Sequence, residues 1–181
     1  MNKKKICIFV SKIQGGGAEK SAVNVANYIA KQGYDIDLIS IKKNQNLKIL
    51  NKKINFISLN SSRLIFALPS LLKYISNKNN KNFYLVPFLN GTNVISIFLK
   101  IIYRKFNLIC TIHNPVSSHY KYTTIKDKII ILLLLLFKHI PDKYITCSKF
   151  IKKELINKYK FNSRNIKYVY NPLNFLEMKQ K

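Results

Sequence analysis

Short apolar runs alternate with longer segments of helical periodicity along the chain, and this alternation constrains the fold more than any other feature. The runs that we expect to be strands are 6–10, 36–41, 54–59, 83–86, 108–112, 144–147 and 166–170. Helices are expected at 18–32, 64–76, 93–103, 124–140 and 149–159. Strands that alternate with helices form parallel sheets with right-handed crossovers and helices on both faces. The 181 residues therefore predict one α/β domain, a Rossmann-like, doubly wound parallel sheet.

Two residues bear on where the expected helices begin and end. Gly33 follows the first helix and is expected to end it, because glycine adopts the left-handed conformation of a C-terminal cap. Pro69 lies inside the segment 64–76, where it must either kink the helix or mark its true first turn.

A glycine-rich loop joins the first expected strand to the first expected helix. Gly15, Gly16 and Gly17 allow a ligand to approach the backbone closely, and a helix N-terminus presents free N–H groups to a phosphate. The dinucleotide fingerprint GxGxxG is not met, because its third glycine would fall on Lys20, and no acid closes the second strand at 40–42. NAD and ATP sites are disfavoured. A differently built diphosphate site and a tight turn without a ligand both remain open.

Five segments, in this order, resemble the N-terminal domain of the GT-B fold glycosyltransferases, in particular the large retaining family numbered four. They are GGAEK at 16–20, KQGY at 31–34, TIHN at 111–114, YITCS at 144–148 and KYVYNP at 167–172. The resemblance implies transfer of a sugar, with retention, from a nucleotide-sugar to a glycan or lipid-linked acceptor in cell-surface polysaccharide biosynthesis. No metal and no cofactor besides the donor substrate are expected.

The resemblance also implies roles for individual residues. His113 would be the catalytic residue and would hydrogen-bond the sugar or position the acceptor, as a neutral imidazole can near pH 7. The other residues expected at the donor diphosphate or the acceptor are Gly15, Gly16, Gly17, Glu19, Asn114 and Ser148. Each of three has a structural alternative: a histidine at a strand end for His113, a plain N-cap for Ser148, and stabilisation of a helix dipole for Glu19.

The family's second domain, which binds the nucleotide and carries an ExxxxxxxE motif, is not expected in this chain. The only glutamates are Glu19, Glu154 and Glu177, and no two of them have that spacing. We expect residues 1–170 to form the N-terminal domain and 171–181 to begin the interdomain linker. A separate donor domain is a candidate partner. The alternative function is an inactive membrane- or glycan-binding module, a truncated or remnant glycosyltransferase.

The charge of the chain is strongly one-sided, since 32 Lys and Arg stand against 7 Asp and Glu, a net charge of +25. Such a charge favours an anionic partner such as a membrane surface. Nucleic acid is disfavoured, because only Arg63, Arg104 and Arg164 are arginines and no nucleic-acid motif is present. The segment 129–137 is too short to span a bilayer. It could lie in a membrane interface, but burial against the sheet is favoured because it is apolar on every face.

The remaining features exclude other classes. Three cysteines are too few for a disulfide scaffold, and the apolar stretch 6–10 is too short for a signal peptide. We therefore expect a cytoplasmic protein, bound peripherally to the inner face of the membrane if its charge has that role. No GxSxG motif or metal-ligand spacing is found. Asp35 and Asp37 are expected at solvated positions on a strand edge.

Overall fold

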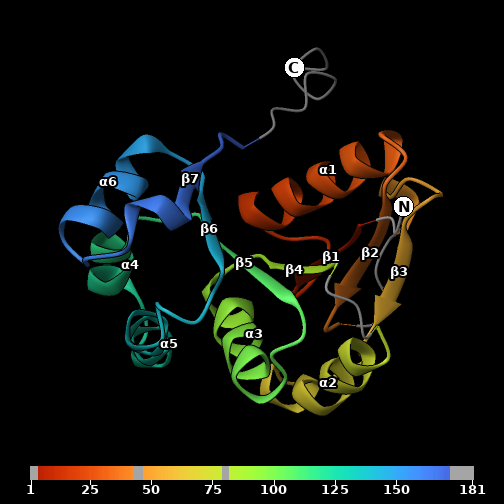
Figure 1. Ribbon diagram of the computed structural model, residues 1–181, viewed down its shortest axis with the longest axis horizontal. Helices are drawn as coiled ribbons and strands as arrows, with labels where there is room; N and C mark the ends of the chain where they lie inside the picture. The colour runs from red at the N-terminus through yellow and green to blue at the C-terminus, as the bar shows by residue number, and fades with distance from the viewer. Residues whose placement is uncertain (1–3, 43–46, 79–81, 172–181) are drawn as a thin grey trace.

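The computed structural model describes residues 4–42, 47–78 and 82–171 and contains one seven-stranded, all-parallel sheet (Figure 1). The strand order is β3-β2-β1-β4-β5-β6-β7, which confirms the doubly wound, Rossmann-like class. The strands are β1 (Lys5–Val10), β2 (Asp35–Ser40), β3 (Asn55–Ser58), β4 (Phe83–Pro87), β5 (Asn107–Ile112), β6 (Lys143–Thr146) and β7 (Ile166–Tyr168). The order reverses between β1 and β4, which is where such sheets bind ligands.

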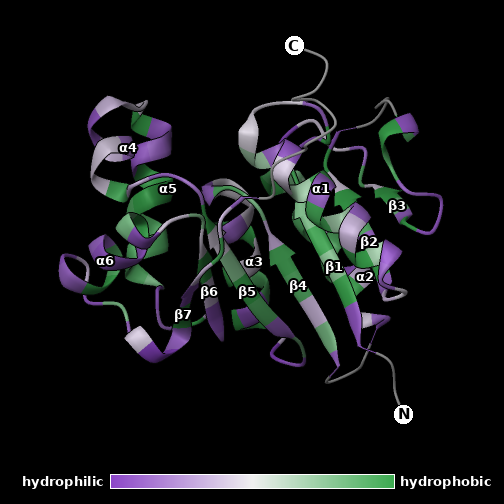
Figure 2. Ribbon diagram, turned by 90° about the horizontal axis from the view of Figure 1, so that it is seen from above, coloured by the Kyte–Doolittle hydropathy of each residue, from purple (hydrophilic) through white to green (hydrophobic). Residues whose placement is uncertain are grey.

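Helices cover both faces of the sheet. They are α1 (Gly17–Lys31), α2 (Leu68–Ser76), α3 (Asn90–Ile102), α4 (Val116–Tyr122), α5 (Ile125–Leu136) and α6 (Lys149–Asn157), with the 3-10 turns η1 (Leu47–Ile49), η2 (Ile65–Ala67) and η3 (Ser163–Asn165). Successive side chains of a strand point to opposite faces of the sheet, so alternate residues of each strand contact the helices on one face and on the other. Ile8 and Val10 pack with α1, whereas Cys7 and Phe9 belong to the core that includes α2, α3, α5 and α6. Figure 2 shows the central strands coloured as hydrophobic over much of their length.

The helix ends follow the local sequence signals. Gly33 adopts φ +80° directly after α1, as a C-terminal cap requires, and Pro69 lies in the first turn of α2. The expected helix 64–76 therefore begins as the turn η2, and its regular part starts at Leu68.

The sequence missed the helix α4 and overextended the helix that follows it. The segment 116–122 is short and polar, so it lacks the apolar periodicity that identifies a helix. The next helix spans Ile125–Leu136 rather than 124–140. Its N-cap residue is Thr124, whose hydroxyl accepts a hydrogen bond from the amide of Asp127 at 3.3 Å.

The expectation that the apolar segment 129–137 is buried holds for one side of the helix, which packs mainly against α3 rather than directly on the sheet. Ile131 and Leu134 are buried, and Ile130, Leu133, Leu135 and Phe137 are partly buried in the same core. The sequence of a helix that is apolar on every side does not show which side will be buried. Here α3 covers one side of α5, and the opposite side is exposed.

The pair of aspartates on β2 also differs from the expectation. Asp35 is half exposed at the strand end, but Asp37 is fully buried. Its carboxylate receives hydrogen bonds from the Tyr74 hydroxyl and, at 3.0 Å, from Asn55 Nδ2, and it lies 3.0 Å from Lys5 Nζ. Asp37 faces the α2 side of the sheet, so this acid is part of the core.

Two absences hold for the described residues. Within 4–42, 47–78 and 82–171, no helix is long and apolar enough to cross a membrane. The same ranges contain no cluster of three His, Cys, Asp or Glu side chains that could hold a metal ion.

Candidate functional site

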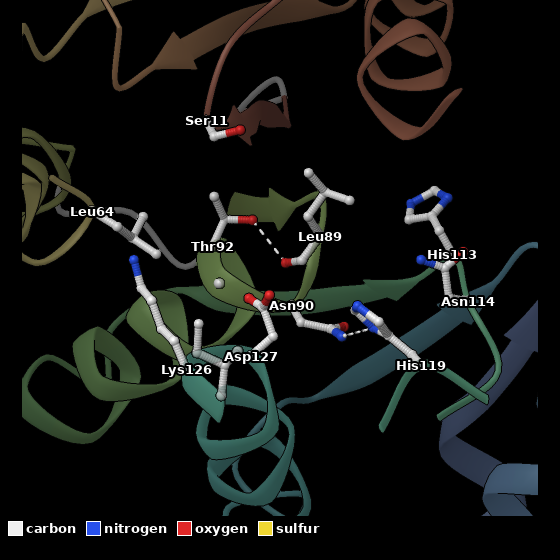
Figure 3. Close-up of a pocket in the computed structure, with 12 residues that line it drawn as sticks. Ser11, Leu64, Leu89, Asn90, Thr92, His113, Asn114, His119, Lys126 and Asp127 are labelled. Atoms are coloured by element: carbon white, nitrogen blue, oxygen red, sulfur yellow. Dashed lines mark hydrogen bonds between the residues drawn. The ribbon is translucent and has the colours of Figure 1, made fainter. Parts of the chain in front are cut away.

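A cavity of about 310 Å³ lies at the carboxyl ends of the central strands (Figure 3). The segment after β1 contributes Ser11, the segment after β4 contributes residues 89–92, and the segment after β5 contributes His113 and Asn114. The remaining lining residues are Leu64, His119, Lys126, Asp127 and Ile130. Ligands of open α/β sheets bind at this edge, next to the point where the strand order reverses.

His113 is held rigidly at the end of β5. Its ring stacks on the ring of Phe88, with centroids 5.1 Å apart and an interplanar angle of 27°. Its Nε2 lies 3.1 Å from Thr111 Oγ1. The side chain of Cys147 contacts the carbonyl oxygen of His113 at 3.1 Å, which ties the end of β5 to the segment that follows β6.

The hydrogen-bond network determines which nitrogen of His113 carries the proton. The hydroxyl of Thr111 donates its single hydrogen to the carbonyl of Pro87 at 2.7 Å, so towards His113 it can only accept. Nε2 must therefore be the protonated nitrogen, and Nδ1 has a free lone pair. Nδ1 is buried and has no hydrogen-bond partner among the described residues. The ring of His113 thus has one unsatisfied hydrogen-bond acceptor, which protein atoms cover in this structure.

The charge state of His113 follows from its surroundings. Burial lowers its pKa below the ordinary 6.5, because an imidazolium is poorly solvated there. The negative charge of Glu19 opposes this shift but does not overcome it. His113 is therefore neutral at pH 7.

The strand β5 separates from β4 just below the site. The two strands are paired only at Tyr84–Asn107 and Leu85–Leu108. Beyond this point the side chain of Asn93 replaces the missing strand: its Nδ2 donates to the Thr111 carbonyl at 2.7 Å, and its Oδ1 accepts from the Thr111 amide at 3.3 Å. A buried backbone needs such partners. No sequence signal identified Asn93.

The glycine loop lies at the start of α1, with Gly16 as its N-cap residue. Glu19, in the first turn, is largely buried and folds back over the loop. A Cβ placed on Gly15 would come within 2.9 Å of the Glu19 carboxylate, and one on Gly16 within 3.4 Å. Nothing lies within 4 Å of the corresponding position on Gly17. The space above the first two glycines is thus filled by side chains, that of Glu19 over both glycines and that of Lys12 over Gly15, where Lys12 Cε would lie 2.7 Å from such a Cβ.

The other two expected site residues have different surroundings. Asn114 is exposed and lines the cavity. Ser148 is the N-cap of α6, and its hydroxyl accepts a hydrogen bond from the Ile151 amide at 3.2 Å. This geometry fits the structural alternative for Ser148. The structure thus brings His113, Asn114 and Glu19 together at one edge of the sheet.

Sequence analysis gave no role to several polar residues that line the cavity. His119 on α4 has its Nδ1 3.2 Å from Nδ2 of Asn90 (Figure 3). Lys126 and Asp127 come from the first turn of α5. A short, polar helix gives no periodic signal, so the approach of His119 to the site could not be anticipated. Leu89 has φ +80°, a value that residues other than glycine rarely adopt, and it lies at the sharp turn from β4 into α3.

The position of α4 depends on one carboxylate from α6. Glu154 accepts hydrogen bonds from the amides of Val116 at 2.8 Å and Ser117 at 2.9 Å, and also from the Ser117 hydroxyl. These amides are the unpaired donors of a helix N-terminus, where a negative charge is stabilising. Glu154 therefore fixes the helix that carries His119.

A second, mostly apolar cavity of about 130 Å³ lies on the α1 side of His113. Its lining includes Phe88, Val169 and Tyr170, and the Ser21 hydroxyl binds the Asn171 side chain at 3.1 Å along its edge. His113 lines both cavities. The expected linker 171–181, apart from Asn171, lies outside the described residues.

Several solved structures share this fold. HepE of Anabaena, determined in complex with UDP, superposes with a TM-score of 0.67 at 13% identity over 95% of this chain and 45% of its own. A glycosyltransferase from Rickettsia africae gives a TM-score of 0.62 at 21% identity, over 96% and 44%. Sucrose-phosphate synthase from Thermosynechococcus elongatus gives 0.68 at 12% identity, over 93% and 48%. The chain thus spans about half the length of each.

Sequence comparison is more specific. An uncharacterized glycosyltransferase from Haemophilus influenzae is 45% identical over 58 residues, which are 32% of this chain and 16% of the relative. The family model described as Glycosyltransferase Family 4 matches residues 15–175, from the glycine loop to beyond the last strand. This match contains the glycine loop, Glu19, His113, Asn114 and Ser148, and by it the chain belongs to glycosyltransferase family 4.

Proposed function

We propose that the domain is the acceptor-binding half of a retaining glycosyltransferase and that its reaction takes place at the carboxyl ends of β1, β4 and β5. The bond between the sugar and the donor diphosphate would break, a new bond from the sugar to the oxygen of an acceptor hydroxyl would form, and the proton of that hydroxyl would pass to the departing diphosphate. Membership of family 4 supports sugar transfer. The UDP and UDP-glucose in complexes of HepE support a nucleotide-sugar as donor.

The observation that carries the proposal is the free Nδ1 of His113. An unprotonated nitrogen can only accept a hydrogen bond, and the oxygens of an ionised diphosphate have no hydrogen to donate. A sugar hydroxyl has one. The neutral charge state of His113 leaves the lone pair of Nδ1 unprotonated at pH 7, and because Nδ1 is buried, a hydroxyl would reach it only after the side chains that cover it move. We therefore assign His113 to a hydroxyl of the transferred sugar or of the acceptor.

The glycine loop is assigned to the donor diphosphate. The start of α1 offers backbone amides and the positive end of a helix dipole. The Glu19 carboxylate lies over Gly15 and Gly16, and two anions at one place would repel each other. Binding of the diphosphate is therefore expected to turn the Glu19 side chain away from the loop.

The acceptor is assigned to the cavity of about 310 Å³, where Asn114, His119, Asp127 and Lys126 offer polar contacts. A net charge of +25 favours an acceptor on an anionic membrane, such as a lipid-linked glycan of cell-surface polysaccharide biosynthesis on the cytoplasmic side. Because the chain spans about half of the matched structures, we expect a second domain, in the same protein or separate, to complete the donor site.

The histidine rings provide a direct test by NMR, because the chain has only three. UDP-glucose serves as the first probe and UDP as its control. We expect UDP-glucose to shift the ring resonances of His113, UDP to shift them less, and exposed His139 to remain unchanged, with His113→Gln providing the assignment. Perturbation of the loop amides at 15–17 without any change at His113 would contradict the assigned role.

The second candidate is a glycan-binding module that performs no transfer, since the polar side chains that line the cavity of about 310 Å³ could bind a glycan without any reaction. A transfer assay separates the two candidates. Radiolabelled nucleotide-sugars are incubated with a lipid extract and the chain, with and without a separately produced donor domain. Incorporation that depends on the chain and on His113 supports the transferase, whereas glycan binding without incorporation supports the module.

A further inference from the structure

The helix α5 exposes one apolar stripe. Ile125, Ile129, Leu132 and Leu136, which we name the α5 stripe, are 78%, 53%, 51% and 69% exposed. Their spacing places them on one side of the helix, whereas Ile131 and Leu134 on another side are buried. Figure 2 shows α5 as a largely hydrophobic ribbon at one side of the molecule. Large exposed apolar patches mark interaction sites.

Basic and aromatic side chains lie at the start of the stripe. Lys121 Nζ is 5.2 Å from the ring centre of Tyr122, and Lys128 Nζ is 5.5 Å from that of Tyr120. Tyr122 is highly exposed, and Lys126 is an exposed residue of the first turn of α5. Tyrosine and lysine with an apolar body and a polar tip are suited to the boundary between hydrocarbon and headgroups.

The far end of the stripe also has aromatic and basic residues beside it. The rings of Phe98 and Phe137 meet with centroids 5.6 Å apart, so the last turns of α3 and α5 lie side by side. Ile102, at the end of α3, is 61% exposed and is followed by exposed Arg104 and Lys105. Basic residues thus lie at both ends of the apolar surface.

The two acids near the surface already have partners. Asp127 accepts hydrogen bonds from the hydroxyls of Thr123 and Thr124 at the helix start. Asp142 pairs with Lys100 at 2.9 Å and accepts from the Leu108 amide at 2.7 Å. Negative charge is therefore scarce here: Asp142 is paired with a lysine, and Asp127 stands between Lys126 and Lys128 in the sequence, so basic residues outnumber acids around the stripe.

We propose that the α5 stripe docks on the surface of an anionic bilayer. The stripe enters the boundary between headgroups and acyl chains, and the surrounding lysines and arginine bind the lipid phosphates. This surface continues to the site, because Lys126, Asp127 and Ile130 of α5 line the cavity of about 310 Å³. Exposed Ile65 and Phe66 follow Leu64 on another side of the same cavity. Docking would bring the cavity to the level of the headgroups.

Other occupants fit the surface less well. A second copy of the chain would bring the same lysines together, and like charges repel. The described chain ends at Asn171 beside Ser21 of α1, whereas α5 belongs to the core on the opposite face of the sheet. A domain that continues from Asn171 therefore starts on the side away from the stripe.

The chain contains no tryptophan, so a single introduced tryptophan reports docking without background. Ile129→Trp places the reporter in the stripe, and Tyr28→Trp places it on α1, where Tyr28 is 65% exposed. Vesicles of neutral phosphatidylcholine, with and without about one third phosphatidylglycerol, are added at low and high salt. Sedimentation with the vesicles is measured for the wild type, for Ile129→Ser/Leu132→Ser and for Tyr28→Ser, and circular dichroism checks that each variant is folded.

We expect the Ile129→Trp emission to shift to the blue only with anionic vesicles, and the Tyr28→Trp emission to stay unchanged. The double serine variant should bind at least about 10-fold more weakly, Tyr28→Ser like the wild type, and Lys128→Gln about five-fold more weakly. Salt-independent binding, equal binding by the folded double variant, or a dimer that the double variant dissociates would each overturn the proposal. The measurement needs no donor or acceptor, so its failure would leave the proposed transfer untouched.

Discussion

The side chain of Asn93 forms two hydrogen bonds with the backbone of Thr111, one to its carbonyl oxygen at 2.7 Å and one from its amide at 3.3 Å. Both residues are buried. Through these two hydrogen bonds the helix α3 holds the last residues of β5, where β5 is no longer paired with β4. Because Thr111 in turn orients the ring of His113, the position of the candidate catalytic histidine depends on an amide from another element.

Asn93→Ala is expected to lower the free energy of unfolding by about 3 kcal/mol, because it leaves a buried amide and a buried carbonyl without partners. Ser96→Ala on the same helix is the matched control. The Ser96 hydroxyl is buried and has no partner among the described residues, so its removal should change stability by less than about 1 kcal/mol. Urea unfolding of both variants measures the difference. Equal effects would contradict the role assigned to Asn93.

The charge of Glu19 should be visible in the titration of His113. Glu19 raises the pKa of His113, although burial keeps that pKa below 6.5. Glu19→Gln is therefore expected to lower the pKa of His113 further. The ring resonances of His113, followed by NMR between pH 4 and about 8 in the wild type and in the variant, give the two pKa values. An unchanged His113 would mean that the carboxylate does not act on the ring.

The same burial makes folding sensitive to acid. Since the pKa of His113 is lower in the folded state, the unfolded chain binds more protons between the two pKa values. The contribution of His113 to stability is complete above pH 6.5 and declines as the pH falls towards the folded pKa. His113→Gln should therefore flatten the stability profile in this window. Thermal unfolding at several pH values tests this.

The sequence was sufficient for the fold class because the alternation of apolar runs is a local property that tertiary packing did not reverse. It also indicated the glycine loop at 15–17 as a candidate phosphate-binding loop, and it placed His113 at the end of a strand. Asn93, His119 and Asp37 could not be predicted in the same way. The role of Asn93 arises from the separation of β4 and β5, and that of His119 from a helix whose position depends on Glu154. Asp37 is buried although it alternates along β2 with the half-exposed Asp35.

The position of α4 gives a further prediction. Glu154→Gln removes the charge that the amides of Val116 and Ser117 contact, which should destabilise this helix by about 1 to 2 kcal/mol. Hydrogen exchange of these two amides should become faster. Lys153→Gln, at an exposed position of the same helix, is the control and should leave the exchange unchanged. Unaltered exchange in Glu154→Gln would show that α4 is held by its other contacts.

Asp35 and Asp37 allow burial to be separated from charge, because each lies 3.0 Å from Lys5 Nζ. Asp37 is fully buried and is also bound by Tyr74 and Asn55, whereas Asp35 is half exposed. Asp37→Asn is expected to lower the free energy of unfolding by about 2 to 3 kcal/mol, since hydrogen bonds to a charged group are lost in the core. Asp35→Asn should cost less than about 1 kcal/mol, as exposed ion pairs do. Equal losses in urea unfolding would show that the contact with Lys5, and not the burial of the carboxylate, determines the contribution of these acids.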